Sequence, residues 1–157
     1  MPAGCGGPGT EPIMEPKDPG YADRVRRIVE DGNFTRALGL SLETVGPGHC
    51  TTGLVVRPDH WQQDGYVHAG VQATLADHTA GSAAYTLVAA DELVLTVEFK
   101  INLLRPAVGR RLRCRADVLR AGRAIVVGES AVYVADDAGE RMCAKAMVTL
   151  AVTSAPG

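Results

Sequence analysis

Apolar and polar residues alternate in two segments of the second half of the chain, at residues 94–103 and 111–119, and two further strands are predicted at residues 124–135 and 141–152. A period of two is typical of half-buried antiparallel strands, because successive side chains point to opposite faces of a sheet. In the first of these segments, the apolar face holds Leu95, Val97, Phe99, Ile101 and Leu103, and the other face holds Thr96, Glu98, Lys100 and Asn102. A further hairpin is predicted at residues 40–45 and 49–56, which a Gly-Pro-Gly turn separates.

One long helix is predicted within residues 65–90, which are rich in alanine, contain no proline and are bounded by acidic residues. A short amphipathic helix is predicted at residues 22–31, closed by Gly32. Only one long helix is therefore available to cover the sheet. The predicted fold class is α+β, with one antiparallel sheet wrapped around one central helix.

The first twenty residues are dominated by glycine and proline and show no apolar period, so residues 1–20 are expected to form a disordered tail. Residues 21–157 are expected to form a single folded domain. The composition is that of an ordinary soluble protein, with 46% hydrophobic and 22% charged residues. A net charge of −2 does not favour a nucleic-acid partner.

No membrane partner is expected either, because the least charged stretch contains an aspartate and two histidines. The N-terminus lacks the basic start and apolar run of a signal peptide, so a cytoplasmic location is expected. The four cysteines include no CxxC pair, and three of them lie in strand-like segments. They are expected to be free thiols rather than disulfides.

Asp77 is the only formally charged residue between Asp64 and Asp91. On a helical wheel its neighbours along the same stripe are all small: Gly70, Ala73, Thr74, Ala80, Gly81 and Ala84. Two interpretations stay open. The stripe either packs the helix closely against the sheet, or it forms a groove in which a ligand approaches the carboxylate.

His68 precedes Asp77 by nine residues, about half a turn out of phase, so a single helix directs the two side chains to opposite sides. Two chains can direct both at one ligand across a dimer interface. The helix start near Ala69 and Gly70 offers free backbone N–H groups that can stabilise an oxyanion. The four histidines have no metal-ligand spacing, and no phosphate loop or GxSxG elbow occurs, so neither a metal nor a cofactor is expected.

Residues 62–77 read Q-x-x-G-x-x-H-A-G-x-x-x-x-L-A-D. This pattern resembles the PaaI-type hotdog thioesterases and the related 4-hydroxybenzoyl-CoA thioesterases, and the resemblance continues through residues 96–98 and 104–109. It covers about residues 38–152. The resemblance implies the hotdog fold, hydrolysis of acyl-CoA thioesters, with aryl- or arylacetyl-CoA as candidate substrates, and assembly into a homotetramer of two homodimers.

By the same resemblance, Asp77 takes the place of the catalytic acid, as a general base or as a nucleophile. Ala69 stands where the family usually has a glycine whose N–H polarises the thioester carbonyl. Gln62 takes the position of an amide that orients substrate or water, and Thr96 matches a Ser/Thr near the site. His68 either orients the loop near the carbonyl or only caps the helix.

The substrate-binding groove is expected to include Gly70, Thr74 and Gly81. Six arginines crowd residues 110–123, and arginine suits the phosphates of CoA. A charge run on an alternating strand is more often a solvated face, so Arg120 and Arg123, which flank a turn, are the better phosphate ligands. The main alternative function is a non-catalytic acyl-CoA-binding protein, a sensor or accessory. A hydratase and a purely structural oligomer are further alternatives.

Overall fold

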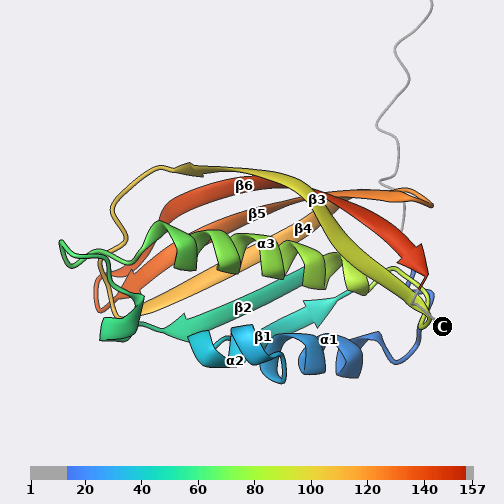
Figure 1. The fold of residues 1–157 in the computed structure, drawn as a ribbon, viewed down its shortest axis with the longest axis horizontal. Coiled ribbons are helices and arrows are strands. Elements are labelled where there is room, and N and C mark those ends of the chain that lie inside the picture. The colour runs from blue at the N-terminus through green and yellow to red at the C-terminus, as the bar shows by residue number, and fades with distance from the viewer. Residues whose placement is uncertain (1–13, 155–157) are drawn as a thin grey trace, which may run out of the picture.

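The computed structural model describes residues 14–154, which form one six-stranded sheet and its covering helices (Figure 1). The strands are β1 (Ser41–Gly46), β2 (His49–Val55), β3 (Glu92–Leu103), β4 (Arg111–Ala121), β5 (Ile125–Asp136) and β6 (Gly139–Ser154). They lie in the order β1-β2-β4-β5-β6-β3, and every neighbouring pair is antiparallel. The predicted hairpin and the four predicted strands are all confirmed.

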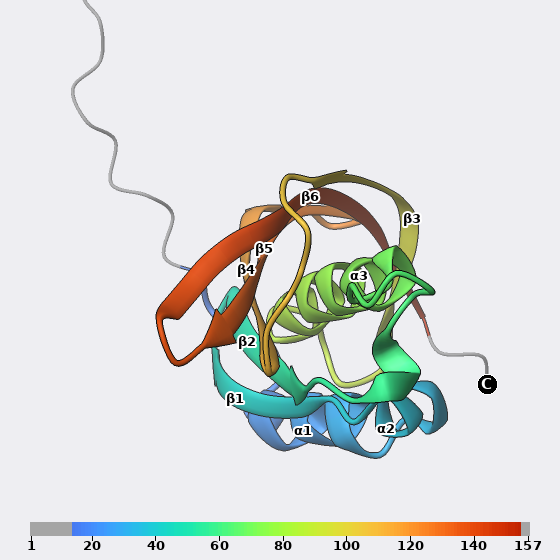
Figure 2. The same cartoon turned by 90° about the vertical axis from the view of Figure 1, so that its left-hand side faces the viewer.

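The long helix α3 (Ala69–Tyr85) lies inside the curve of the sheet, which bends around it as the end-on view shows (Figure 2). The predicted α+β arrangement is therefore confirmed. Small buried residues, among them Ala76, Ala80 and Ala83, allow the strands to approach this helix closely. A buried hydrogen bond of 2.6 Å between the hydroxyls of Thr79 and Thr52 joins α3 to β2.

Two further helices, α1 (Tyr21–Glu30) and α2 (Asn33–Leu38), lie beside β1 at the edge of the sheet, as both views show (Figures 1 and 2). Val25 and Val29 of α1 are fully buried, so this helix closes the core at that edge. Sequence patterning predicted α1 but missed α2. A one-turn 3₁₀ helix, η1 (Pro58–His60), leads into the segment before α3.

Alternation predicts the buried face of β4 correctly: Leu112, Cys114, Ala116 and Val118 are all buried. Of the four cysteines, Cys50, Cys114 and Cys143 are free and buried, as expected. Burial raises the pKa of both Cys50 and Cys114 to about 12, so these thiols are unreactive.

In the N-terminal part of β3 the predicted faces are wrong, because a β-bulge lies at Val97, whereas the predicted common face of Phe99, Ile101 and Leu103 is confirmed. Thr96 pairs with Leu150, whereas Glu98 pairs with Thr149, so one residue of β3 has no partner. Residues directly opposite each other share a face. Thr96 therefore faces the helix together with Phe99, Ile101 and Leu103, which pair with Val148, Ala146 and Ala144. Leu95 pairs with Ala151 and faces outward instead.

Only part of the predicted disordered tail falls among the described residues, since residues 1–13 lie outside them. Met14 is half-buried and packs against the core, and the Lys17 ammonium lies 3.7 Å from a Glu92 carboxylate oxygen. Residues 14–20 thus contact the folded body. Within residues 14–154, no helix is both long and apolar enough to cross a membrane.

Candidate active site

Asp77 lies in the middle of α3 and is half-buried. Its Oδ1 atom accepts a hydrogen bond of 2.8 Å from the Thr96 hydroxyl of β3. This contact exists because the bulge at Val97 turns Thr96 toward the helix. Two residues predicted separately for the site are thus in direct contact, and the Asp77 carboxylate keeps its second oxygen free of protein donors within the described chain.

A cavity of about 240 Å³ lies beside this pair and is also lined by Gly81, His78 and Ser82. At Gly81, an added Cβ would approach only Leu150, at 3.8 Å, so the glycine leaves open space next to the carboxylate. Burial lowers the pKa of His78, so this ring is neutral at neutral pH. Of the small-residue stripe around Asp77, Gly81 lines this hollow, whereas Ala80 and Ala84 are fully buried against the core, so the stripe serves both close packing and the open space beside the carboxylate.

The N-terminus of α3 lines a second cavity, of about 350 Å³, together with Gln62 and the segment from Leu103 to Ala107. Ala69 is the first helical residue and is exposed. Within residues 14–154 its N–H has no acceptor, as expected of the first N–H groups of a helix. Gln62 is half-buried and accepts a hydrogen bond from the Asp64 N–H through its side-chain oxygen. The predicted oxyanion donor and the predicted amide thus share one cavity.

His68 is the N-cap of α3, since its Nδ1 atom accepts a hydrogen bond of 2.8 Å from the Gly70 N–H. His68 therefore caps α3, and its role near the thioester carbonyl stays a prediction. The Gly70 N–H is occupied by this cap, which leaves the Ala69 N–H as the free donor. The Thr74 hydroxyl donates to the Gly70 carbonyl at 2.8 Å and is likewise occupied by its own helix.

A third cavity, of about 340 Å³, is lined by His68, Gly70 and Thr74 on one side. Phe34 and Trp61, which are 64% and 50% exposed, line its other side. Sequence analysis missed both aromatic residues, because neither lies in the motif or in a periodic segment. Exposed aromatic side chains of this kind are typical of a surface that binds a ligand or a partner chain.

The two chemical centres of the site are separated within one chain. Ala69 and Asp77 are eight residues apart, which is about 12 Å along the helix axis. They also line different cavities. A single chain therefore does not bring the oxyanion donor and the carboxylate together on one small group.

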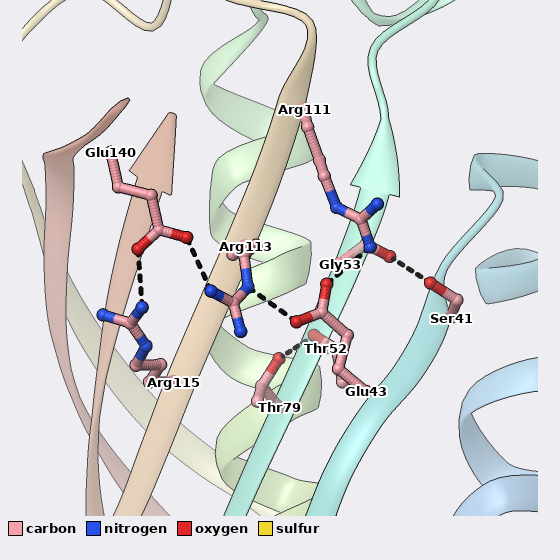
Figure 3. A network of polar contacts seen from close by, with 9 residues as sticks. All are labelled: Ser41, Glu43, Thr52, Gly53, Thr79, Arg111, Arg113, Arg115 and Glu140. Atoms are coloured by element: carbon pink, nitrogen blue, oxygen red, sulfur yellow. Dashed lines mark hydrogen bonds and ion pairs between the residues drawn. The ribbon is translucent and has the colours of Figure 1, made fainter. Parts of the chain in front are cut away.

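The arginines of β4 are mostly engaged in an ion-pair network on the outer face of the sheet (Figure 3). Glu43 of β1 pairs with Arg111 and Arg113, each at 2.6 Å, and Glu140 of β6 pairs with Arg113 at 2.7 Å and Arg115 at 2.5 Å. The prediction that this charge run forms a solvated face is confirmed.

Arg120 and Arg123, the two predicted phosphate ligands, are exposed and form no ion pair within the described residues. Arg123 lines a cavity with Leu87 and Val88, which follow the C-terminus of α3. It therefore lies at the opposite end of the helix from Ala69. Within residues 14–154, no three metal-ligating side chains come together as a metal site.

The curved antiparallel sheet around one long helix defines the hotdog fold. The chain matches the model of the thioesterase superfamily over residues 64–149. The chain therefore belongs to the thioesterase superfamily and is a thioester hydrolase by family.

Individual relatives agree with this assignment. A 1,4-dihydroxy-2-naphthoyl-CoA hydrolase of Listeria monocytogenes is 27% identical over 106 residues, which cover 68% of this chain and 85% of the relative. The structure of a thioesterase family protein from Silicibacter pomeroyi is 35% identical, covers 87% of this chain and 100% of its own, and has a TM-score of 0.84. A thioesterase of Haemophilus influenzae shares the fold, with a TM-score of 0.78 at 20% identity over 90% of this chain and 96% of its own.

Proposed function

We propose that this protein hydrolyses acyl-CoA thioesters to the free acid and CoA, with Asp77 as the catalytic carboxylate. The observation that carries the proposal is the Asp77–Thr96 hydrogen bond of 2.8 Å at the edge of an open cavity. A carboxylate held in this way has one oxygen fixed by a neutral donor and the other free to act as base or nucleophile.

The complete site forms between two chains of a homodimer. β3 is an edge strand of the sheet, and its exposed Leu95, Val97, Phe99 and Leu103 are 55%, 62%, 40% and 50% exposed. An apolar edge strand of this kind favours pairing with a second copy. Thr96, which contacts Asp77, lies on this strand, so such pairing places the partner chain next to Asp77. Association of two dimers into a homotetramer is part of the proposal and rests on the family resemblance.

In the proposed reaction, the thioester carbonyl oxygen accepts a hydrogen bond from the Ala69 N–H of one chain. The dipole of α3 adds a positive potential at this position. Asp77 of the other chain either removes a proton from an attacking water or attacks the carbonyl carbon itself. When water attacks, loss of the CoA thiolate gives the acid directly, and the proton taken by Asp77 passes to the thiolate. When Asp77 attacks, loss of the thiolate leaves a mixed anhydride with Asp77, which a water then hydrolyses to the acid and the free carboxylate. One oxyanion donor of this type contributes about 3–4 kcal/mol to the transition state.

The proposed acyl group is aryl or arylacetyl. Phe34 and Trp61 offer aromatic walls on the cavity that Gly70 and Thr74 also line, and aromatic rings stack on such walls. The Listeria relative carries the name of a naphthoyl-CoA hydrolase. Arg120 and Arg123 remain the proposed phosphate ligands because they form no ion pair in the described chain. A cytoplasmic location fits the buried free thiols.

The direct test is a panel of aryl-, arylacetyl- and straight-chain acyl-CoAs with detection of the free CoA thiol. Wild-type protein is expected to release thiol fastest from the aromatic members. Asp77→Asn is expected to fold and assemble normally and to lose nearly all turnover, because the amide provides neither a base nor a nucleophile. Binding of acyl-CoA without any turnover in the wild type favours the non-catalytic sensor instead.

The two-chain site is tested by mixing two inactive variants. Ala69→Pro removes only the proposed donor, because proline suits the first position of a helix. The preceding His68 already has φ −58° and ψ 140°, which a following proline accepts. In a heterodimer of Asp77→Asn and Ala69→Pro subunits, one of the two sites is intact. Random exchange should restore about a quarter of wild-type activity. If mass measurement shows exchange and no activity returns, Asp77 acts with groups of its own chain.

A further inference from the structure

Gln72 lies in the first turn of α3 and is 4% exposed. Its side-chain Nε2 donates a hydrogen bond of 3.1 Å to the Val67 carbonyl oxygen. Because this contact requires the nitrogen, the Oε1 atom is directed away from Val67. Within residues 14–154 this oxygen has no hydrogen-bond donor. A buried carbonyl oxygen without a donor destabilises a protein, so an acceptor left free in this way suggests that another molecule satisfies it.

The position of Gln72 indicates which molecule can donate a hydrogen bond to its side-chain oxygen. Gln72 lines the same 350 Å³ cavity as Ala69. Gln72, which carries the buried unpaired acceptor, and Ala69, which carries the free N–H donor, therefore line one cavity and lie about 5 Å apart along the helix axis. The remaining walls include the apolar side chains of Leu103, Leu104 and Pro106. Gln62, Tyr66 and Arg105 also line this cavity, which therefore combines several polar side chains with the Ala69 donor, the unpaired Gln72 acceptor and an apolar wall.

We infer that the Gln72 Oε1 atom accepts a hydrogen bond from the amide N–H of the pantetheine arm next to the thioester sulfur. This inference rests on the proposed function. In a CoA thioester, two methylene groups separate the sulfur from this amide, and the thioester itself contains no donor. When the thioester carbonyl oxygen accepts a hydrogen bond from the Ala69 N–H, the amide N–H is the first hydrogen-bond donor along the pantetheine arm. The apolar wall contacts the methylene groups between them.

Gln72 is therefore a positioning residue that recognises the carrier of the acyl group, not the acyl group itself. Its Nε2 bond to Val67 holds the acceptor in place. Val67 directly precedes the His68 cap of α3. Binding of the carrier amide and exposure of the Ala69 donor thus depend on the same helical turn.

The first experiment compares two short thioesters of one aromatic acid that differ only in the carrier. One carrier is N-acetylcysteamine, which keeps the amide, and the other is its acetoxyethyl analogue, in which an ester oxygen replaces the N–H. Wild-type protein is expected to have a kcat/KM about tenfold or more higher for the amide carrier, the size of effect of leaving a buried acceptor unpaired. Where turnover of these thioesters is slow, the preference is measured instead as the ratio of their inhibition constants against acyl-CoA hydrolysis.

The second experiment repeats this comparison with Gln72→Met, which keeps the length of the side chain and removes the acceptor. The amide preference is expected to disappear. General damage to the helix start would lower both rates equally and leave the ratio unchanged. Gln63→Met is the matched control, since Gln63 is an exposed glutamine outside the cavity and its replacement should leave the preference intact.

The outcomes separate this inference from the proposed function. If no acyl-CoA is hydrolysed, the proposed function fails. If acyl-CoA is hydrolysed but the wild type does not prefer the amide carrier, only the role of Gln72 is overturned. A preference that persists in Gln72→Met also overturns it, because another acceptor must then bind the amide. The wild-type comparison needs no variant, so misfolding of Gln72→Met does not prevent the test.

Discussion

A side chain at position 53 of β2, where the protein has Gly53, is expected to destabilise the fold as long as Glu43 is present. The outer-face ion pairs cross β2 at this residue, and Gly53 lies beside Glu43 and Arg111 in the network (Figure 3). A Cβ at position 53 would lie 2.5 Å from the Glu43 Oε1 atom and 3.3 Å from an Arg111 nitrogen. In Gly53→Ala, the Glu43 carboxylate must therefore move away from Arg111 and Arg113.

The magnitude follows from two opposing effects. Glu43 forms two ion pairs of 2.6 Å whose side chains are partly exposed, and each such pair contributes about 0.2–1 kcal/mol. Their loss lowers the free energy of unfolding by about 0.4–2 kcal/mol. Replacing glycine by alanine restricts the unfolded chain and stabilises the fold by about 0.4–1 kcal/mol. The expected net loss is about 1 kcal/mol, or about 2–4 °C in Tm for a chain of this length.

The assay is a double-mutant cycle of Gly53→Ala and Glu43→Ala by thermal or urea unfolding. Protomer concentration must be constant, because association changes apparent stability. Glu43→Ala removes the obstructing carboxylate, so adding Gly53→Ala to it should be neutral or slightly stabilising. The change of sign between the two backgrounds is the expected result. Equal destabilisation in both would refute the reasoning and would attribute the effect to the Leu112 carbonyl oxygen, which lies 3.2 Å from the added Cβ.

Two further predictions concern the site and its supporting loop. Thr96→Val removes the donor to Asp77 with little change of shape and should lower kcat about 10- to 100-fold, the effect of losing a hydrogen bond to a charged group. Thr96→Ser should retain most activity, and equal rates in wild type and Thr96→Val would contradict the contact. Burial and the nearby Arg57 charge lower the pKa of His60 below its ordinary value of 6.5. Below that pH the unfolded chain binds a proton that the folded chain does not, so stability present above pH 6.5 is lost as pH falls toward the folded pKa, by at most about 1.4 kcal/mol per pH unit. A His60→Gln variant should show a shallower pH dependence of Tm, and an unchanged slope would exclude His60 as a cause.

Local patterns in the sequence determined most of the fold. The period of two in β4, the strands β5 and β6 and the helical segment of α3 were predictable, because strand and helix faces depend on neighbours only a few residues away. Asp77 was identifiable for the same reason, since a lone charge in a long uncharged helix is a local signal. The free Ala69 N–H also followed from its place at the start of that helix.

Only the tertiary structure determined which side chains of the site are in contact. The alternation of β3 placed Thr96 on the polar face, but pairing with β6 inserts a bulge at Val97 and turns Thr96 to Asp77. The free acceptor of Gln72 depends on a hydrogen bond to Val67, five residues earlier, and on burial by the sheet. The bulge has no local signature, because the register of β3 against β6 sets it, and the burial of Gln72 depends on packing by segments that are distant in the chain.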